Sequence, residues 1–269
     1  MDIFSDKAKS TNDGLEQSES DHFRKHGWIG PFPLLPPDGV KAVVEAHNSS
    51  IHRFMPGHML SQARHADAFT QHPWFKSLHA YLPHFYDIAC HPSLVSRVAS
   101  IIGPDVVVWG VSVTIRRPRD IHRWHVDVEH RRWRGISAFI GLSGTSSLST
   151  LKVIGGSHRI VQTPQEIGVS NDSEAIAEAL KREPKCELVT PELREGEFFL
   201  FDGTLWHGSA NIGEDTRYAV IAQYSPTSER IKIPLTWNEP IDWHQSSPPC
   251  VLVRGTDHYG INRLVSRPA

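Results

Sequence analysis

Residues 195–225 read "EGEFFLFDGTLWHGSANIGEDTRYAVIAQYS", and this stretch decides the fold class. Two runs of aromatic and β-branched residues, 197–201 and 217–225, flank a region rich in Asp, Gly, Ser and Asn. Short apolar runs bounded by turn-forming residues are typical of β-strands. The stretch therefore predicts two strands, with a turn at 202–204 and His207 shortly after the first strand.

The segments upstream have the same character. Further strands are predicted at 105–117, 135–143, 149–156 and 186–190, and only one helical segment, 171–183, interrupts them. Predicted helices precede the strands, at 37–50 and 91–103, and the segment 18–30 predicts a short helix that runs into a strand at 28–32. Because strands and helices do not alternate regularly, the pattern argues against a parallel doubly wound sheet. We expect a mainly β sandwich or jelly-roll barrel supported by N-terminal helices.

The chain is long enough for a substantial core, and we find no internal repeat or linker. Residues 1–18 are polar without apolar periodicity and are expected to form a mobile tail, so that 19–269 is a single domain. Residues 227–269 contain proline-rich loops and one short strand. We expect this last segment to act as a lid over the site or as a dimer contact, in a monomer or homodimer.

Composition limits the classes of function. Of 269 residues, 39% are apolar and 22% charged, and the formal net charge is −2, so nothing in the balance favours nucleic acid or a membrane surface as partner. Three widely spaced cysteines and the lack of a secretion signal predict a soluble cytoplasmic protein. Eight of the 17 histidines fall within 47–91, where no metal-ligand partner has suitable spacing, and we interpret them as structural or surface residues.

A metal-ligand pattern lies in "WHVDVEH", residues 124–130. If this segment is a strand, His125, Asp127 and Glu129 share one face, because side chains alternate along a strand. His125 and Asp127 could be a hydrogen-bonded pair or two ligands of one metal. His207, 82 residues (207 − 125) downstream, supplies a third ligand from a separate strand. Two imidazoles and one carboxylate form the facial triad of non-haem Fe(II) oxygenases, which leaves coordination positions open.

Arg217 lies ten residues beyond His207, at the start of the predicted strand 217–225. If this strand runs antiparallel beside the one that ends near His207, the guanidinium can point into the same cavity. A planar guanidinium binds a carboxylate through two parallel hydrogen bonds. A small keto-diacid could then chelate iron at one end and pair with Arg217 at the other.

In these motifs the chain resembles the phytanoyl-CoA dioxygenase family of Fe(II)/2-oxoglutarate oxygenases. The resemblance rests on "WHVD", "LKVIGGSHRI", "WHGSANIGEDTRYAVIAQYS" and the opening "HFRKHGWIG", and covers roughly residues 20–228. It implies a double-stranded β-helix, the cupin-like jelly roll, with Fe(II), 2-oxoglutarate and O2 as cofactor and co-substrates. It further implies that His125, Asp127 and His207 bind iron and that Arg217, with Ser209 and Thr114, binds 2-oxoglutarate.

The resemblance implies oxidation of an aliphatic C–H bond, coupled to decarboxylation of 2-oxoglutarate to succinate and CO2. Related halogenases have a small residue in place of the carboxylate ligand, so Asp127 favours hydroxylation. Candidate contacts to a small, anionic substrate are Arg117, Trp124, Glu129 and Ser157. For each of these the alternative is structural: an ion-paired surface arginine, a packing residue or a loop-shaping hydroxyl. The family commonly has a lysine about where Arg117 stands.

Two other classes of function remain open from the sequence. A cupin-like zinc or manganese enzyme, a hydrolase or isomerase, could use the same three ligands but has no special need for Arg217. A non-catalytic protein could retain the fold, although all three ligand types and the arginine are intact.

Overall fold

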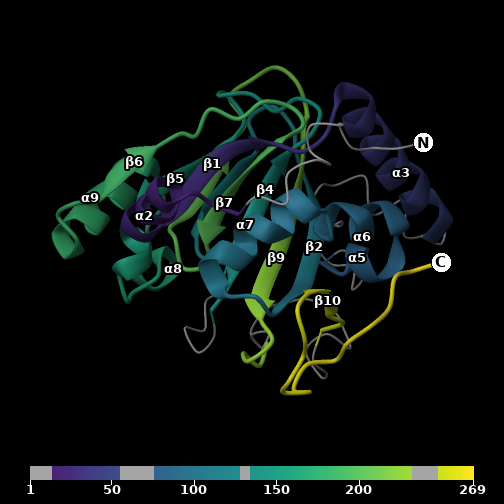
Figure 1. Ribbon diagram of the computed structural model, residues 1–269. Coiled ribbons are helices and arrows are strands. Elements are labelled where there is room, and N and C mark those ends of the chain that lie inside the picture. Colours follow the sequence, from purple (N-terminus) through teal and green to yellow (C-terminus); the bar gives the residue numbers. More distant parts are fainter. Residues whose placement is uncertain (1–13, 55–75, 128–133, 232–247) are drawn as a thin grey trace.

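Two antiparallel β-sheets form the frame of the protein (Figure 1). The structure is a computed structural model that describes residues 14–54, 76–127, 134–231 and 248–269. The larger sheet has the order β1-β7-β4-β9-β2-β10 and the smaller sheet the order β3-β8-β5-β6. The strands are β1 (Trp28–Pro33), β2 (Val106–Arg116), β3 (Ile121–His125), β4 (Ile136–Gly141), β5 (Leu151–Gly155), β6 (Glu187–Val189), β7 (Glu197–Asp202), β8 (His207–Ala210), β9 (Arg217–Pro226) and β10 (Val251–Arg254). The predicted jelly roll is confirmed.

The central strands of the larger sheet are buried on both faces. On β7, Phe199 and Phe201 face the smaller sheet and pack with Leu151 and Val153 of β5. The alternate residues of β4 and β7 face the opposite way and pack against helices. Burial on both faces explains why these strands are nearly continuous apolar runs in the sequence.

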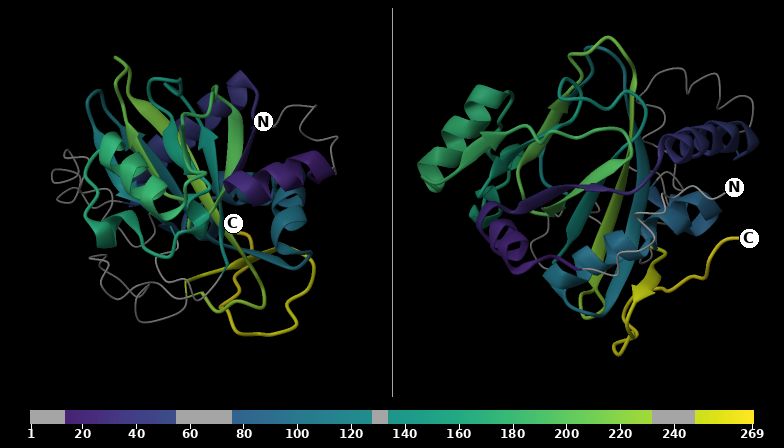
Figure 2. Two further views of the ribbon diagram at one scale, coloured as in Figure 1. Left: turned by 90° about the vertical axis from the view of Figure 1, so that its left-hand side faces the viewer. Right: turned by 45° about the horizontal axis from the view of Figure 1, so that its top comes forward.

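Helices cover the outer face of each sheet (Figures 1 and 2). On the larger sheet lie α3 (Pro37–Phe54), α5 (Leu78–Tyr81), α6 (Pro83–Ala89) and α7 (Pro92–Ile102). On the smaller sheet lie α8 (Pro164–Ile167) and α9 (Asp172–Arg182). The predicted helix end at Gly103 is confirmed, since Gly103 has φ 104°. Asn171 and Asp172 were both candidates to cap the helix predicted over 171–183, and the cap is Asn171, whose side chain accepts the Glu174 N–H. In the described ranges, no helix is long and apolar enough to cross a membrane.

The expected tail is shorter than residues 1–18. Helix α2 (Gln17–His26) begins inside that range, because Glu16 and Glu19 form a reciprocal capping box at its start. The backbone N–H of Leu15 donates to Ser100 Oγ of α7, which attaches the chain to the domain at that point. Residues 1–13 lie outside the described ranges, so the prediction of a mobile tail stays a prediction for them.

The described part of the C-terminal segment belongs to the domain. Strand β10 pairs with β2 at the edge of the larger sheet, and Arg267 makes two hydrogen bonds to the Asp87 carboxylate of α6. Residues 232–247 lie outside the described ranges, so a lid or dimer role for 227–269 is not decided there.

His79 ties α5 to this C-terminal segment. Its Nε2–H donates to the carbonyl of Pro249 at 2.8 Å, while Nδ1 is buried without a hydrogen-bond partner among the described residues. A second proton on Nδ1 would have no acceptor there. Burial, partly offset by the Pro249 hydrogen bond, accordingly lowers the pKa of His79 from 6.5 to about 4. His58, His65 and His72, spaced by seven before His79, lie outside the described ranges.

This geometry predicts a pH dependence of stability. Because the folded-state pKa of His79 lies below the unfolded value, the unfolded chain takes up the proton first as the pH falls. The His79 contribution is therefore complete above pH 6.5 and declines towards pH 4. We expect the difference in unfolding free energy between wild type and His79→Gln to shrink by about 2 kcal/mol from pH 7 to pH 4.5 in urea titrations. Parallel pH profiles for the two proteins would contradict this.

Candidate metal centre

Three side chains from two strands and a bend converge inside the jelly roll. His125 ends β3, and its register partner on β8 is His207, the first residue of that strand. Asp127 Oδ1 lies 3.5 Å from His207 Nε2 and 3.8 Å from His125 Nε2. The three ligand atoms all lie within 4.8 Å of one another. Among the described residues this is the one cluster of His, Cys, Asp or Glu with metal-ligand spacing.

The strand predicted at 124–130 ends earlier than expected. Strand β3 stops at His125, and Asp127 lies in a bend after it, so the two ligands are not brought together by strand alternation. Instead, the Ser137 hydroxyl on β4 of the opposite sheet donates to Asp127 Oδ2 at 2.5 Å. This hydrogen bond directs the carboxylate towards the histidines. Glu129 lies outside the described residues.

Backbone carbonyls orient both imidazoles for metal binding. Nδ1 of His125 lies 2.8 Å from the Arg123 carbonyl, and Nδ1 of His207 lies 2.9 Å from the Leu205 carbonyl. Because a carbonyl only accepts, each Nδ1 carries the proton and each Nε2 keeps a lone pair for a metal. Burial and the proximity of His207 lower the pKa of His125 to about 3, so the ring is neutral at pH 7.

The carboxylate is ionised. Burial raises the pKa of Asp127, but His207, His125 and the Ser137 hydrogen bond outweigh burial and lower it below the usual range. Two imidazoles and one carboxylate are nitrogen and oxygen donors, and the carboxylate adds a negative charge. This donor set suits a divalent transition metal such as Fe(II).

Arg217 is the first residue of β9, and its strand does not lie beside β7 or β8 as expected. Strand β4 separates β9 from β7 in the larger sheet, whereas β8 belongs to the smaller sheet. Arg217 therefore reaches the interior from across the sandwich. Its guanidinium lies 5.2 Å from the Phe139 ring centre, and Nη1 donates to the Ser149 carbonyl at 2.7 Å.

The charge of Arg217 has no acidic partner in the described part of the chain. The residue is 1% exposed, and Nε has no hydrogen-bond partner there. Burial, with Arg116 next to it, lowers the pKa of Arg217 to about 9, so it remains charged at pH 7. A buried cation is costly unless an anion accompanies it. The site thus fits the carboxylate of a bound co-substrate.

The register of β5 gives the order of the metal ligands, Ser209 and Arg217 along the interior. Val153 is the register partner of His207, and Leu151 is the partner of Ser209. Ser149, which accepts from Arg217, lies two residues further on. Each two-residue step along a strand is about 7 Å. Ser209 therefore lies at a level between the metal ligands and Arg217, and its buried hydroxyl has no partner among the described residues.

The register of β2 brings a residue to the site that sequence reasoning missed. Arg116 is the register partner of Arg217, and Thr114 that of Ala219 on the same face, with Thr114 Oγ1 3.5 Å from the Ala219 carbonyl. Arg117, a candidate substrate contact at the position where the family commonly has a lysine, lies in an exposed turn where its backbone N–H donates to Asp120. A bulge between Val108 and Gly110 shifts the register, and no sequence signal marked its position.

Two of the candidate substrate residues have structural surroundings. Trp124 faces away from the ligands into an outer core with Ile154 and Trp206, and its Nε1–H donates to Asp172. The Ser157 hydroxyl accepts the Trp206 backbone N–H at 2.8 Å and is fully buried. These positions do not support direct substrate contacts for either residue.

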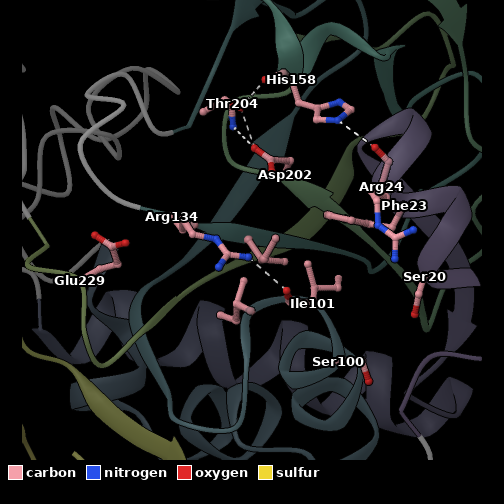
Figure 3. Close-up of a pocket in the computed structure, with 13 residues that line it drawn as sticks. Ser20, Phe23, Arg24, Ser100, Ile101, Arg134, His158, Asp202, Thr204 and Glu229 are labelled. Carbon is pink, nitrogen blue, oxygen red and sulfur yellow. Dashed lines mark hydrogen bonds between the residues drawn. The ribbon is translucent and has the colours of Figure 1, made fainter. Parts of the chain in front are cut away.

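A separate cavity of about 540 Å³ lies between α2, α7 and the β7–β8 turn (Figure 3). None of the three metal ligands lines it. Two of its polar side chains bond to protein atoms, since Thr204 donates to Asp202 and Arg134 donates to the Ile101 carbonyl, whereas His158 Nδ1 has no partner among the described residues. The Asp202–Thr204 contact shapes the turn that leads to His207.

The role of Ser137 can be tested by metal binding. Without its hydroxyl, Asp127 Oδ2 loses the donor that orients it, so Ser137→Ala should weaken Fe(II) affinity about tenfold. Competition with a chromophoric chelator under anaerobic conditions measures this. The control is Ser225→Ala, because Ser225 also lies on the larger sheet but its hydroxyl donates to the Arg134 carbonyl. Equal affinity in both variants and wild type would show that Ser137 does not support the ligand.

Comparisons with known proteins agree with this geometry. Residues 23–219 match the sequence family described as "Phytanoyl-CoA dioxygenase (PhyH)". No curated protein matches the chain by sequence.

Solved structures share the fold over nearly the whole chain. The apo form of the non-heme monooxygenase ThoJ has a TM-score of 0.67 and 21% identity, covering 93% of this chain and 88% of ThoJ. CytC3 with Fe(II) and alpha-ketoglutarate has a TM-score of 0.67 and 18% identity, covering 95% and 94%. EctD from S. alaskensis with 2-oxoglutarate and 5-hydroxyectoine has a TM-score of 0.65 and 23% identity, covering 100% and 95%. With the family match over most of its length, the chain belongs to the phytanoyl-CoA dioxygenase (PhyH) family of Fe(II)/2-oxoglutarate-dependent oxygenases.

Proposed function

We propose that the protein hydroxylates an aliphatic C–H bond of a small, anionic molecule, with Fe(II), 2-oxoglutarate and O2. The observation that carries the proposal is that two oppositely charged groups face the interior of one jelly roll. An anionic His–Asp–His cluster lies at one level, and the buried guanidinium of Arg217 faces the same interior from the opposite sheet.

Each group has a defined task in this proposal. His125, Asp127 and His207 hold iron on one face and leave the remaining positions for co-substrate and O2. Arg217 pairs with the distal carboxylate of 2-oxoglutarate, and Ser209, Thr114 and Arg116 contribute further contacts. When bound, iron with 2-oxoglutarate and O2 supplies the oxidising power that cleaves the C–H bond.

The chain itself excludes water and fixes geometry. Phe139, Phe199 and Phe201 line the interior between the sheets, and the Phe201 ring centre lies 4.8 Å from that of His207. An apolar wall at this place protects an oxidant from side reactions with water and protein. The residues around the ligands therefore bind and orient, and none of them needs to transfer a proton.

Asp127 supports hydroxylation over halogenation. Its carboxylate is held by Ser137 and the two histidines, so that it can occupy a coordination position that a halide would need. Hydroxylation is accordingly the preferred outcome. Desaturation and ring formation use the same centre and differ only in the fate of the substrate after hydrogen abstraction.

The substrate class rests on charge and on the relatives. Arginines are frequent around the first two ligands, at 116, 117, 119, 123, 131, 132 and 134, and an anionic substrate fits this surrounding. The EctD structure contains 5-hydroxyectoine, and ThoJ is named a monooxygenase, which supports oxidation of a small molecule here as well. We further propose a cytoplasmic monomer or homodimer with no nucleic-acid or membrane partner.

The alternative is a cupin-like zinc or manganese hydrolase or isomerase. The three ligands alone would serve it. Arg217 argues against this alternative, because a guanidinium buried without an acidic partner in the described residues would then have no anion to bind.

Anaerobic titration with Fe(II) and then 2-oxoglutarate tests the co-substrate. Chelation should give a visible metal-to-ligand charge-transfer band in the wild type. Asp127→Ala should lose the band through loss of iron. Arg217→Ala should keep iron affinity and weaken 2-oxoglutarate binding by about tenfold or more, because a charge-assisted pair is removed. Arg217→Lys is the matched control that keeps the charge but loses the planar fork. Tight zinc binding and no band in the wild type would favour the cupin-like alternative.

Product analysis distinguishes the outcomes. In a reaction under ¹⁸O2 with chloride and bromide present, we expect one ¹⁸O atom in the product and one in succinate, and no halogenated product. Mass spectrometry of the extracted substrate pool provides the measurement. A product that carries halogen would overturn the role assigned to Asp127.

A further inference from the structure

His122 lies three residues before the first metal ligand, and the sequence did not mark it as part of the site. Its register partner on β8 is Ser209, whereas that of His125 is His207. Three residue steps on β3 therefore match two on β8, which is a β-bulge formed by Arg123 and Trp124. Because of this bulge, His122 and His125 both face the interior although they lie an odd number of residues apart.

The ring of His122 contacts the ring of a metal ligand. Its centre lies 4.2 Å from that of His125, with 45° between the planes, and His125 in turn lies 4.1 Å from His207. The three imidazoles thus form a continuous row across β3 and β8. A ring packed this closely restricts the orientation that His125 can adopt, in addition to the hydrogen bond at its Nδ1.

His122 also brings a polar group to which no described residue forms a hydrogen bond. In the described part of the chain neither ring nitrogen has a hydrogen-bond partner, although an imidazole carries at least one N–H donor in either protonation state. Across the strand pair, the buried Ser209 hydroxyl also has no partner there. Two unmatched groups thus face each other at the level between the metal ligands and Arg217.

Packing at this place needs only a ring, which a phenyl group would also supply. An imidazole adds an N–H donor beside His125. The ring contact with His125 places His122 beside the metal ligands, although its register partner Ser209 lies one two-residue step from the level of His207 and one from that of Ser149. The ligand that fits is therefore an acceptor next to the metal, and a metal-chelating carboxylate is such an acceptor.

We propose that His122 binds and positions the co-substrate: its ring supports His125, and its N–H donates to the metal-chelating carboxylate of 2-oxoglutarate. The inference rests on the proposed function. In this inference His122 binds the metal-chelating end of 2-oxoglutarate, and Arg217 binds its distal carboxylate.

Two variants distinguish support of His125 by the ring from hydrogen bonding by the N–H. His122→Phe keeps the ring and removes the donor, whereas His122→Gln keeps a donor and removes the ring. Two keto acids distinguish the chelating end of the co-substrate from its distal end, because 2-oxobutanoate chelates metal like 2-oxoglutarate but lacks the distal carboxylate. Full-length protein is titrated anaerobically with Fe(II) and then with each keto acid, and the charge-transfer band is followed.

We expect His122→Phe to bind Fe(II) within about twofold of wild type and to bind both keto acids about tenfold more weakly. His122→Gln should recover much of the keto-acid affinity and lose affinity for Fe(II). Arg217→Ala should weaken 2-oxoglutarate alone and leave 2-oxobutanoate unchanged. Substitution of the exposed His84 by Gln, the control for loss of a histidine, should alter none of these constants.

Wild-type affinity of His122→Phe for both keto acids would overturn the inference. Weaker binding of 2-oxoglutarate alone would also overturn it, because the donor would then serve the distal end. If the wild type binds Fe(II) but neither keto acid, the proposed function fails instead, and the two failures are therefore distinguishable.

Discussion

The site depends on one register, the antiparallel pairing of β3 with β8. This pairing puts His125 opposite His207 although they are far apart in the chain. A shift by one residue would turn one imidazole to the outer face, where Trp124 and Trp206 pack. The apolar contacts of those two tryptophans on the outer side and of Val153 and Phe201 on the inner side hold the register. Packing on both faces of the smaller sheet is therefore what makes the metal centre.

The second organising feature is charge separation across the sandwich. The smaller sheet and the bend after β3 carry the anionic ligand cluster, and the larger sheet carries Arg217 beside Arg116. Among the described residues Arg217 has no acidic partner. In the proposed function a divalent metal compensates the carboxylate of the cluster, and the distal carboxylate of 2-oxoglutarate compensates Arg217, because a buried charge is costly without a counter-charge.

Local features of the fold followed from the sequence because they depend on local physics. The helix end at Gly103 and the apolar strands in the larger sheet were predicted at their observed places, and the cap of the helix over 171–183 was narrowed to Asn171 or Asp172. The three metal ligands and Arg217 could also be named, because few residue types bind iron or a distal carboxylate. The predicted strand through 124–130 was wrong, since it ends at His125, and so was the expectation that β9 lies beside the strand before His207.

What the sequence by itself determined was therefore the fold class, the ligand types and the family. Only the tertiary structure decided which sheet presents each ligand, that Arg116 rather than Arg117 stands beside Arg217, and that His122 joins the row of imidazoles. The reason is physical. Strand propensity and ligand chemistry are properties of single residues and short segments. Registers and bulges are set by packing between strands that lie far apart in the chain, and one inserted residue turns a side chain to the other face.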